Sequence, residues 1–417
     1  MRVFVKTYGC TLNQADSEVL KGVLSERGVE MCESVDGADV VVLNTCFVKK
    51  QTQQRILHRL RKLAGKKIVV AGCMPSANRW MVEKASPKAS IVGPYSLSKI
   101  YDAVLSAYEG NKIIFLDAKP EDKYSLPKMR EGVVARIPIS EGCASCCSFC
   151  VTKLARPVLH SYDEGAIIRE IARCVGAGFR EIRLTSMDTG AYGLDKKTDL
   201  PSLLERIDRI EGKFLTRVGM INPEHAVRML PDLIEAFKSD KIYKFLHMPL
   251  QSGDEEVLRS MNRRYSPREF MHVAEEFRKE FSELTLATDI IVGFPTESGE
   301  AFSRTIDVIN ELKPDVVNTS KFFPRPGTKA AKMRLLPDAV VAERSRTVSA
   351  LCRDISLRKN RQFIGKELEV LLTERAGNCM AGRTRSYKQV VLNKGKLGEF
   401  VEVSIKDATV CCLKATA

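Results

Sequence analysis

The sequence predicts an α/β protein in three parts: a parallel α/β domain, an open (βα)6 partial barrel and a small C-terminal β-barrel. Strand-like apolar runs alternate with helix-length segments over most of the 417 residues, which favours parallel sheets. Beyond about Gly365 the pattern changes to short β-rich runs between glycine and charged turns, which indicates a small barrel. The predicted boundaries are a first domain at 1–118, a linker at 119–132, a second domain at 133–355 and a third at 356–417.

Three cysteines, Cys10, Cys46 and Cys73, follow strand-like runs of the first domain. Because the carboxyl ends of parallel strands line one edge of a sheet, we expect their thiols to converge on a site with three thiolate ligands. Three scattered core cysteines are the alternative. The predicted strands are Arg2–Lys6, Asp39–Leu43, Ile68–Ala71 and Lys112–Leu116, with helical segments such as Ala15–Glu26 between them.

The second domain is predicted as six strands that alternate with helices, and barrels of this kind place their chemistry at the carboxyl ends of the strands. A cysteine-rich loop follows the first strand at that end. The predicted strands are Val134–Ile139, Glu181–Leu184, Thr216–Met220, Tyr243–Met248, Leu284–Val292 and Asp315–Phe322. The predicted helices are Asp163–Val175, Pro201–Ile210, Pro267–Glu280 and Ser298–Leu312. In the third domain the predicted strands are Leu368–Thr373, Gln389–Leu392, Phe400–Ile405 and Thr409–Leu413.

The loop carries Cys143, Cys147 and Cys150 in the pattern C-x3-C-x2-C. Three thiolates at this spacing can bind three irons of a [4Fe-4S] cube and leave the fourth iron open to a substrate or cofactor. A zinc site from the pairs Cys143/Cys146 and Cys147/Cys150 is one alternative, but such pairs usually stand about a dozen residues apart. A disulfide and a thioredoxin-like redox pair are the others. We expect Cys146 not to be a ligand.

The formal net charge of +14 indicates a polyanionic partner, and a nucleic acid fits best. The segment 49–67 holds eight basic residues and no acidic one. Within it, Arg55, Arg59 and Lys62 recur at helical spacing above a predicted apolar face of Ile56, Leu60 and Leu63. Residues 356–417 contain 12 Lys and Arg against 6 Asp and Glu, which favours RNA contact there too. Solvated charged surfaces are the alternative in both places.

No apolar run approaches the roughly 18–20 residues that span a bilayer, and the N-terminus runs directly into a strand-like pattern. We therefore expect a cytoplasmic protein that is not bound to a membrane and whose 13 cysteines stay reduced. Six cysteines lack ligand-like spacing and are predicted to be small core residues, namely Cys32, Cys174, Cys352, Cys379, Cys411 and Cys412.

Several further motifs stand in a fixed order along the chain. They are Tyr8-Gly9-Cys10, Asn44-Thr45-Cys46, Asp188-Thr189-Gly190-Ala191-Tyr192-Gly193, Arg217-Val218-Gly219-Met220-Ile221-Asn222-Pro223, His247-Met248-Pro249-Leu250-Gln251-Ser252-Gly253, Asp289-Ile290-Ile291-Val292-Gly293-Phe294-Pro295 and Arg325-Pro326-Gly327-Thr328. With the cysteine loop, they resemble the radical S-adenosylmethionine (SAM) methylthiotransferases over the whole length, with a C-terminal TRAM-like domain. The sequence is most similar to the archaeal and eukaryotic branch of this family, which modifies N6-threonylcarbamoyladenosine in tRNA.

The resemblance implies conversion of that nucleoside, at position 37 of tRNA, to its 2-methylthio form. It implies two [4Fe-4S] clusters, one that binds SAM at Cys143, Cys147 and Cys150 and releases a 5′-deoxyadenosyl radical to activate the adenine C2 carbon. The other, at Cys10, Cys46 and Cys73, would hold and deliver the methylated sulfur. The tRNA would be the partner, together with an unidentified sulfur source and electron-donor protein. Polar residues at strand ends are candidates to bind SAM, with structural hydrogen bonds as the alternative role, and they are Asp188, Arg217, Asn222, Gln251 and Asp289.

The sequence departs from the family pattern at three places. Arg156 is followed by Pro157 where the family commonly has Arg-Gly, Ser186-Met187 replaces Gly-Gln, and Cys146 adds a thiol to the loop. Two other functions stay open at this point. One is methylthiolation of a ribosomal-protein aspartate, and the other is a non-catalytic iron-sulfur protein that binds RNA.

Overall fold

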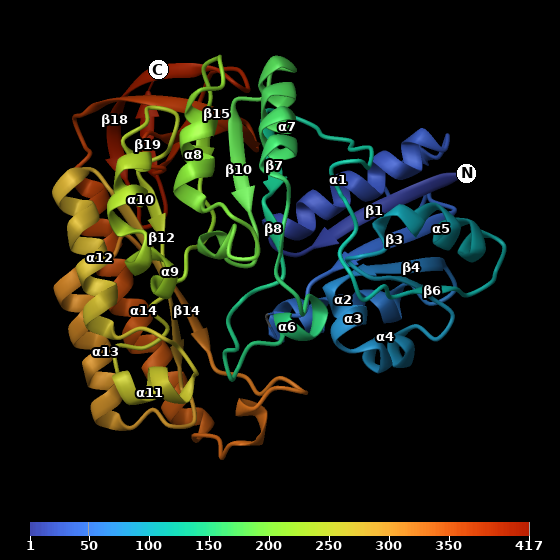
Figure 1. The fold of residues 1–417 in the computed structure, drawn as a ribbon, viewed down its shortest axis with the longest axis horizontal. Coiled ribbons are helices and arrows are strands. Elements are labelled where there is room, and N and C mark those ends of the chain that lie inside the picture. Colours follow the sequence, from blue (N-terminus) through green and yellow to red (C-terminus); the bar gives the residue numbers. More distant parts are fainter. Residues whose placement is uncertain (49, 417) are drawn as a thin grey trace.

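The computed structural model describes residues 1–48 and 50–416 and divides into three parts (Figure 1). The N-terminal sheet with its helices, drawn in blue, lies beside the partial barrel, drawn in green to orange. The small red barrel packs at the top end of the partial barrel in this view. The α/β class with parallel sheets and a closed C-terminal barrel is therefore confirmed. No helix among these residues is long and apolar enough to cross a membrane.

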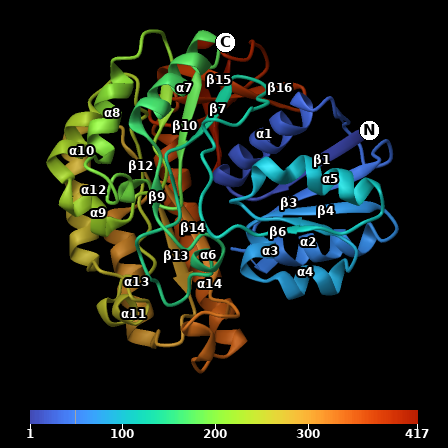
Figure 2. The same ribbon diagram turned by 45° about the vertical axis from the view of Figure 1, so that its right-hand side comes forward.

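The N-terminal part is a parallel six-stranded sheet in the order β2-β1-β3-β4-β5-β6. Helices α1 and α5 cover one face, and α2, α3 and α4 lie on the other (Figure 2). Its strands are β1 Arg2–Tyr8, β2 Glu30–Met31, β3 Val40–Thr45, β4 Lys67–Gly72, β5 Ser90–Val92 and β6 Ile114–Phe115. Its helices are α1 Thr11–Glu26, α2 Lys50–Lys62, α3 Cys73–Ala77, α4 Arg79–Ala85 and α5 Ile100–Tyr108.

The partial barrel is built from two three-stranded parallel sheets, β7-β10-β11 and β12-β13-β14, that an isolated bridge between Thr216 and Ile242 links. All six predicted strands are present, with ends shifted by up to three residues. They are β7 Val134–Pro138, β10 Glu181–Thr185, β11 Leu215–Arg217, β12 Phe245–His247, β13 Thr285–Val292 and β14 Val316–Lys321. A short pair, β8 Ser140–Glu141 and β9 His160–Ser161, closes the base of the cysteine loop.

The helices of this part bear out the predicted alternation. Helix α12 shows why the sequence fixes them, because a capping box of Ser266 and Glu269 starts it and Phe270, Val273 and Phe277 bury one face. The others are α6 Thr152–Ala155, α7 Glu164–Gly176, α8 Leu200–Asp208, α9 Pro223–Arg228, α10 Leu230–Phe237, α11 Glu255–Ser260, α13 Gly299–Leu312 and α14 Asp338–Arg361.

The C-terminal part is a closed barrel in the order β15-β16-β17-β19-β18. Its strands are β15 Glu367–Ala376, β16 Cys379–Thr384, β17 Gln389–Leu392, β18 Phe400–Ala408 and β19 Leu413–Thr416. The predicted strand Thr409–Leu413 is wrong, because Thr409 and Cys412 form a tight turn in which the Thr409 amide donates to the Cys412 carbonyl at 2.8 Å. The aromatic ring of Tyr387 joins the barrel to the second part by packing on Tyr243 and Phe245.

The prediction that the six cysteines without ligand-like spacing are core residues is only partly right. Cys174 and Cys352 are buried in the large core of the second part. Cys411 is exposed, and Cys32, Cys379 and Cys412 are half-buried, because they lie in turns or near strand ends rather than under a helix.

Candidate active site

Cys10, Cys46 and Cys73 lie at one edge of the N-terminal sheet, where the sequence places them. The register pairs Tyr8 with Thr45 and Thr45 with Gly72, so the carboxyl ends of β1, β3 and β4 are level. Cys10 caps α1 and is exposed, while Cys46 and Cys73 are buried. Burial, together with the nearby Cys73 and Cys10 thiols, raises the pKa of Cys46 to about 12.

Asn13 joins two of these thiols. Its Oδ1 accepts from Cys10 Sγ at 3.4 Å and lies 3.9 Å from Cys73 Sγ. Its amide donates to Asn44 Oδ1 and the Thr45 carbonyl, both at 3.2 Å, so α1 and β3 are fixed to each other beside the cysteines. Gly72 supplies the last bend with φ of +92°, and a side chain there would collide with Asn44 and Thr45.

Cys143, Cys147 and Cys150 lie on a tight loop between β8 and α6. The loop starts at Gly142, whose φ of +67° brings its backbone against the Val158 carbonyl, where a side chain would not fit. The thiols border a cleft of about 180 Å³ whose opposite wall is formed by Gly327, Thr328 and Lys329.

Cys146 differs from its neighbours in the loop because it is exposed. Its Sγ accepts from Lys153 Nζ at 3.5 Å, and its carbonyl accepts from the Asn262 side chain at 2.7 Å. Cys143 is more buried than Cys146. Its burial, and to a smaller extent the nearby Asp188 carboxylate, raises the pKa of the Cys143 thiol to about 12.

The two cysteine groups are neighbours in space. Val151, directly after Cys150, packs into the N-terminal core with Phe47 and Met74, which are adjacent to Cys46 and Cys73. Arg325 completes the connection from the other side, because its guanidinium donates to the Val48 carbonyl and stacks on Phe47 at 5.4 Å. The segment from Arg325 to Lys329 therefore borders both sites.

Arg263 is a site residue that sequence reasoning missed. Its guanidinium donates to Cys147 Sγ at 3.2 Å, to Asn222 Oδ1 at 3.0 Å and to the Tyr265 hydroxyl at 3.1 Å. Asn262 beside it adopts a left-handed backbone with φ of +58°. The Met-Asn-Arg-Arg-Tyr segment after α11 thus contacts and supports the cysteine loop. The only sequence signal for this role is the mixture of polar and aromatic residues next to a buried helix end.

Two of the five candidate SAM contacts lie against the cysteine loop. Asn222 caps α9, and its amide donates to Ser145 Oγ at 3.0 Å. Asp188 is buried and accepts from the backbone amides of Gly190 and Asn222 at 3.1 and 3.0 Å. Burial raises the pKa of Asp188. The Asp188 carboxylate therefore orders the backbone from which Asn222 reaches the loop.

The other three candidates have different surroundings. Asp289 accepts from Asn318 at 3.0 Å and lies 2.9 Å from His247 Nε2. Gln251 has φ of +67° and a buried side-chain oxygen without a hydrogen-bond partner in the part of the chain that the structure describes. Arg217 stacks on Phe245 and on Tyr387 of the C-terminal barrel at 5.1 and 5.7 Å, which gives it a packing role between domains.

The chemistry of the donor sets fits iron-sulfur clusters better than single metal ions. Among residues 1–48 and 50–416, no three His, Cys, Asp or Glu side chains gather tightly enough to hold one ion. Each group nevertheless brings three thiols into electrostatic range of one another. Sulfur-directed hydrogen bonds from Ser145, Val48 and Arg263 are the contacts that tune cluster thiolates.

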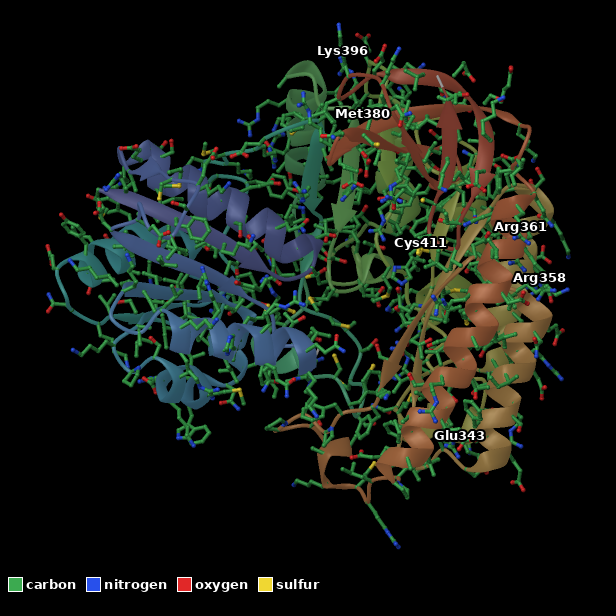
Figure 3. The ribbon with its side chains drawn as sticks, turned by 180° about the vertical axis from the view of Figure 1, so that it is seen from behind. Glu343, Arg358, Arg361, Met380, Lys396 and Cys411 are labelled. Carbon is green, nitrogen blue, oxygen red and sulfur yellow. The ribbon has the colours of Figure 1, made fainter. Side chains whose placement is uncertain are left out.

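Basic side chains lie at the surface of α2, of α14 and of the C-terminal barrel. Helix α2 exposes Arg55 and Lys62 above the buried Ile56 and Leu60, as predicted, and in the described residues neither cation forms an ion pair. Lys49, which the predicted basic run includes, lies outside the described residues. Figure 3 shows Arg361 near the end of α14 and Lys396 on the C-terminal barrel, both at the surface.

Family models match all three parts of the chain. The model described as "Uncharacterized protein family UPF0004" matches residues 2–93, the radical SAM superfamily matches 137–309, and the TRAM domain matches 361–417. A solved radical S-adenosylmethionine methyltransferase from Kitasatospora setae, TsrM, shares the fold with a TM-score of 0.59 at 13% identity, over 79% of this chain and 75% of that one.

Two curated relatives align with almost the entire sequence. A probable threonylcarbamoyladenosine tRNA methylthiotransferase of Archaeoglobus fulgidus is 47% identical over 98% of this chain and 96% of its own length. The corresponding Pyrococcus horikoshii protein is 43% identical over 98% and 97%. The chain therefore belongs to the threonylcarbamoyladenosine tRNA methylthiotransferase family, whose members are radical SAM enzymes.

Proposed function

We propose that this protein adds a methylthio group to C2 of N6-threonylcarbamoyladenosine at position 37 of tRNA. Cys143, Cys147 and Cys150 hold the [4Fe-4S] cluster that binds SAM, and Cys10, Cys46 and Cys73 hold a second [4Fe-4S] cluster. The observation that carries the proposal is the convergence of Cys10, Cys46 and Cys73 where β1, β3 and β4 end at the same level. This group lies directly beside the loop that carries Cys143, Cys147 and Cys150.

The bound groups supply the radical and the sulfur that an unactivated aromatic carbon requires. The protein's own part is to bind and orient. Asn222 and Arg263 fix the Cys143 loop, and Asp188 fixes Asn222. The cleft beside the loop, which Lys329 also lines, is the place where a small molecule can approach the Cys143 loop.

The remaining assignments are proposals of the same kind. Gln251 and Asp289 are the further candidates to contact SAM, since the buried Gln251 oxygen has no partner among the described residues. The basic faces of α2 and of the C-terminal barrel bind the tRNA backbone. A separate protein supplies electrons and another source supplies sulfur, and the enzyme works in the cytoplasm. We place the domains at 1–118, 133–355 and 356–417, joined by the linker 119–132.

The test is nucleoside mass spectrometry of tRNA incubated anaerobically with the reconstituted protein, SAM, sulfide and a chemical reductant. We expect a nucleoside heavier by one sulfur and one methylene, which is roughly 46 mass units. The matched control is tRNA that lacks the threonylcarbamoyl group. A protein that cleaves SAM and leaves tRNA unchanged, but methylthiolates a ribosomal-protein aspartate, would contradict the proposal.

A further inference from the structure

A cluster of four buried charges lies between the two cysteine sites. Asp16 on α1, Lys123 in the linker, Glu141 on β8 and Arg156 after α6 each expose at most 1% of their surface. Lys123 Nζ lies 2.5 Å from Asp16 Oδ1 and 2.5 Å from Glu141 Oε1. Arg156 bonds the second oxygen of each carboxylate. Two cations and two anions balance, which a site without access to water requires.

Arg156 also reaches a cysteine of the other site. Its Nε donates to Cys73 Sγ at 3.4 Å, although Arg156 follows Cys150 by only six residues. Its partner Glu141 stands two residues before Cys143, so Arg156 joins the two ends of the Cys143 loop and ties them to Asp16 and Cys73 of the N-terminal domain. Pro157 favours an extended backbone at the preceding residue, and Arg156 has φ of −139° and ψ of 76°.

We infer that Arg156 is a positioning residue that fixes the Cys73 thiolate and the spacing between the two cysteine sites, an inference that rests on the proposed function. Arg156 uses three different nitrogens for three acceptors, on Cys73, Glu141 and Asp16. A lysine offers a single nitrogen and cannot reproduce this arrangement. Pro157 disfavours a helical backbone at the residue before it, and Arg156 makes these three contacts from a non-helical backbone.

Arg130 is a matched control within the same chain. It is also a buried arginine that joins α1 to the second domain, because its guanidinium bonds Glu18 at 2.8 Å and Glu170 at 2.6 Å. It even contacts a thiol, Cys174 Sγ at 3.3 Å, but Cys174 belongs to neither cysteine site. Replacing either arginine by lysine therefore removes similar interdomain contacts, and only Arg156→Lys removes a contact to Cys73.

The first measurement uses full-length protein in which Cys143, Cys147 and Cys150 are replaced by alanine, so that iron reports on the second site alone. In this background we expect Arg156→Lys to release iron to a chelator at least about tenfold faster and to change the electron paramagnetic resonance spectrum. Arg130→Lys should match the background protein. Equal iron release and unchanged spectra in the two variants would overturn the inference, whereas a background protein that binds no cluster contradicts the proposed function.

The second measurement needs no iron. Cys73 is only 7% exposed and lies against Arg156. We expect alkylation of Cys73, followed by peptide mass spectrometry, to be several times faster in Arg156→Lys than in Arg130→Lys, with Cys10 as the internal reference. Equal Cys73 rates in the two variants would overturn the assignment of Arg156, whatever the cluster content.

Discussion

Lys123→Met tests the buried charges most severely. The substitution leaves the carboxylates of Asp16 and Glu141 with Arg156 as their sole cation in the cluster. Breaking a buried pair of this kind costs about 3–5 kcal/mol, because the remaining charge can neither reach water nor find a new partner. We expect the free energy of unfolding, measured by urea titration of the iron-free chain at pH 7, to fall by that amount.

Lys21→Met is the matched control. Lys21 also lies on α1 and pairs at 3.3 Å with Glu131 of the predicted linker, but both side chains are substantially exposed, so its loss should cost about 0–1 kcal/mol. Adding Asp16→Asn to Lys123→Met restores the balance of charge, and the double variant should be less unstable than the sum of the single changes. Equal costs for Lys123→Met and Lys21→Met would refute the reasoning.

Asp315 pairs with Lys359 and with Lys388, both at 2.7 Å, and these pairs, Arg263 and the exposed cations of α2 give three further predictions. Asp315→Asn should destabilise the chain at pH 7: burial alone would raise the pKa of Asp315, but Lys388 and Lys359 hold it below its usual value. That stability is lost as the wild-type carboxylate protonates, so urea midpoints of the two proteins should converge below about pH 4 and differ above it; a constant gap would contradict this. Arg263→Lys should slow SAM cleavage about 10–100-fold, measured as 5′-deoxyadenosine, and a wild-type rate would remove Arg263 from the site. Replacing Arg55 and other exposed α2 cations by glutamine should weaken tRNA binding. The slope of the logarithm of the binding constant against the logarithm of the salt concentration should become less steep by about 0.7–0.9 for each lost phosphate contact. An unchanged slope would mean that α2 is only a solvated face.

Local sequence was sufficient for the six strands of the partial barrel and for the positions of the two cysteine groups. Cys10, Cys46 and Cys73 could be predicted because each follows a strand-like run, and parallel strands bring such positions together whatever the loops between them do. The turn at Thr409 was missed for the opposite reason. Its hydroxyl and its backbone amide both donate to the Cys412 carbonyl, and this local turn overrides the β propensity of its neighbours.

The charged residues around the site could not be predicted in this way. Lys123 lies in the segment predicted as a linker, and its burial depends on Asp16, which is 107 residues away. Arg263 and Cys147 are 116 residues apart. Arg217 stacks on Tyr387 of the C-terminal barrel, a contact that nothing in its local sequence indicates. In each case the residue that makes the contact comes from another domain or a distant loop, and no periodicity in the sequence indicates such a contact.

We propose that the two cysteine sites perform different parts of one reaction. The most direct test compares Cys46→Ser with Cys150→Ser in one anaerobic assay that measures both 5′-deoxyadenosine and methylthiolated nucleoside. We expect Cys150→Ser to lose both products, and Cys46→Ser to keep forming 5′-deoxyadenosine without methylthiolated tRNA. Equal loss of 5′-deoxyadenosine in the two variants, or methylthiolation by Cys46→Ser, would contradict this division of roles between the two sites.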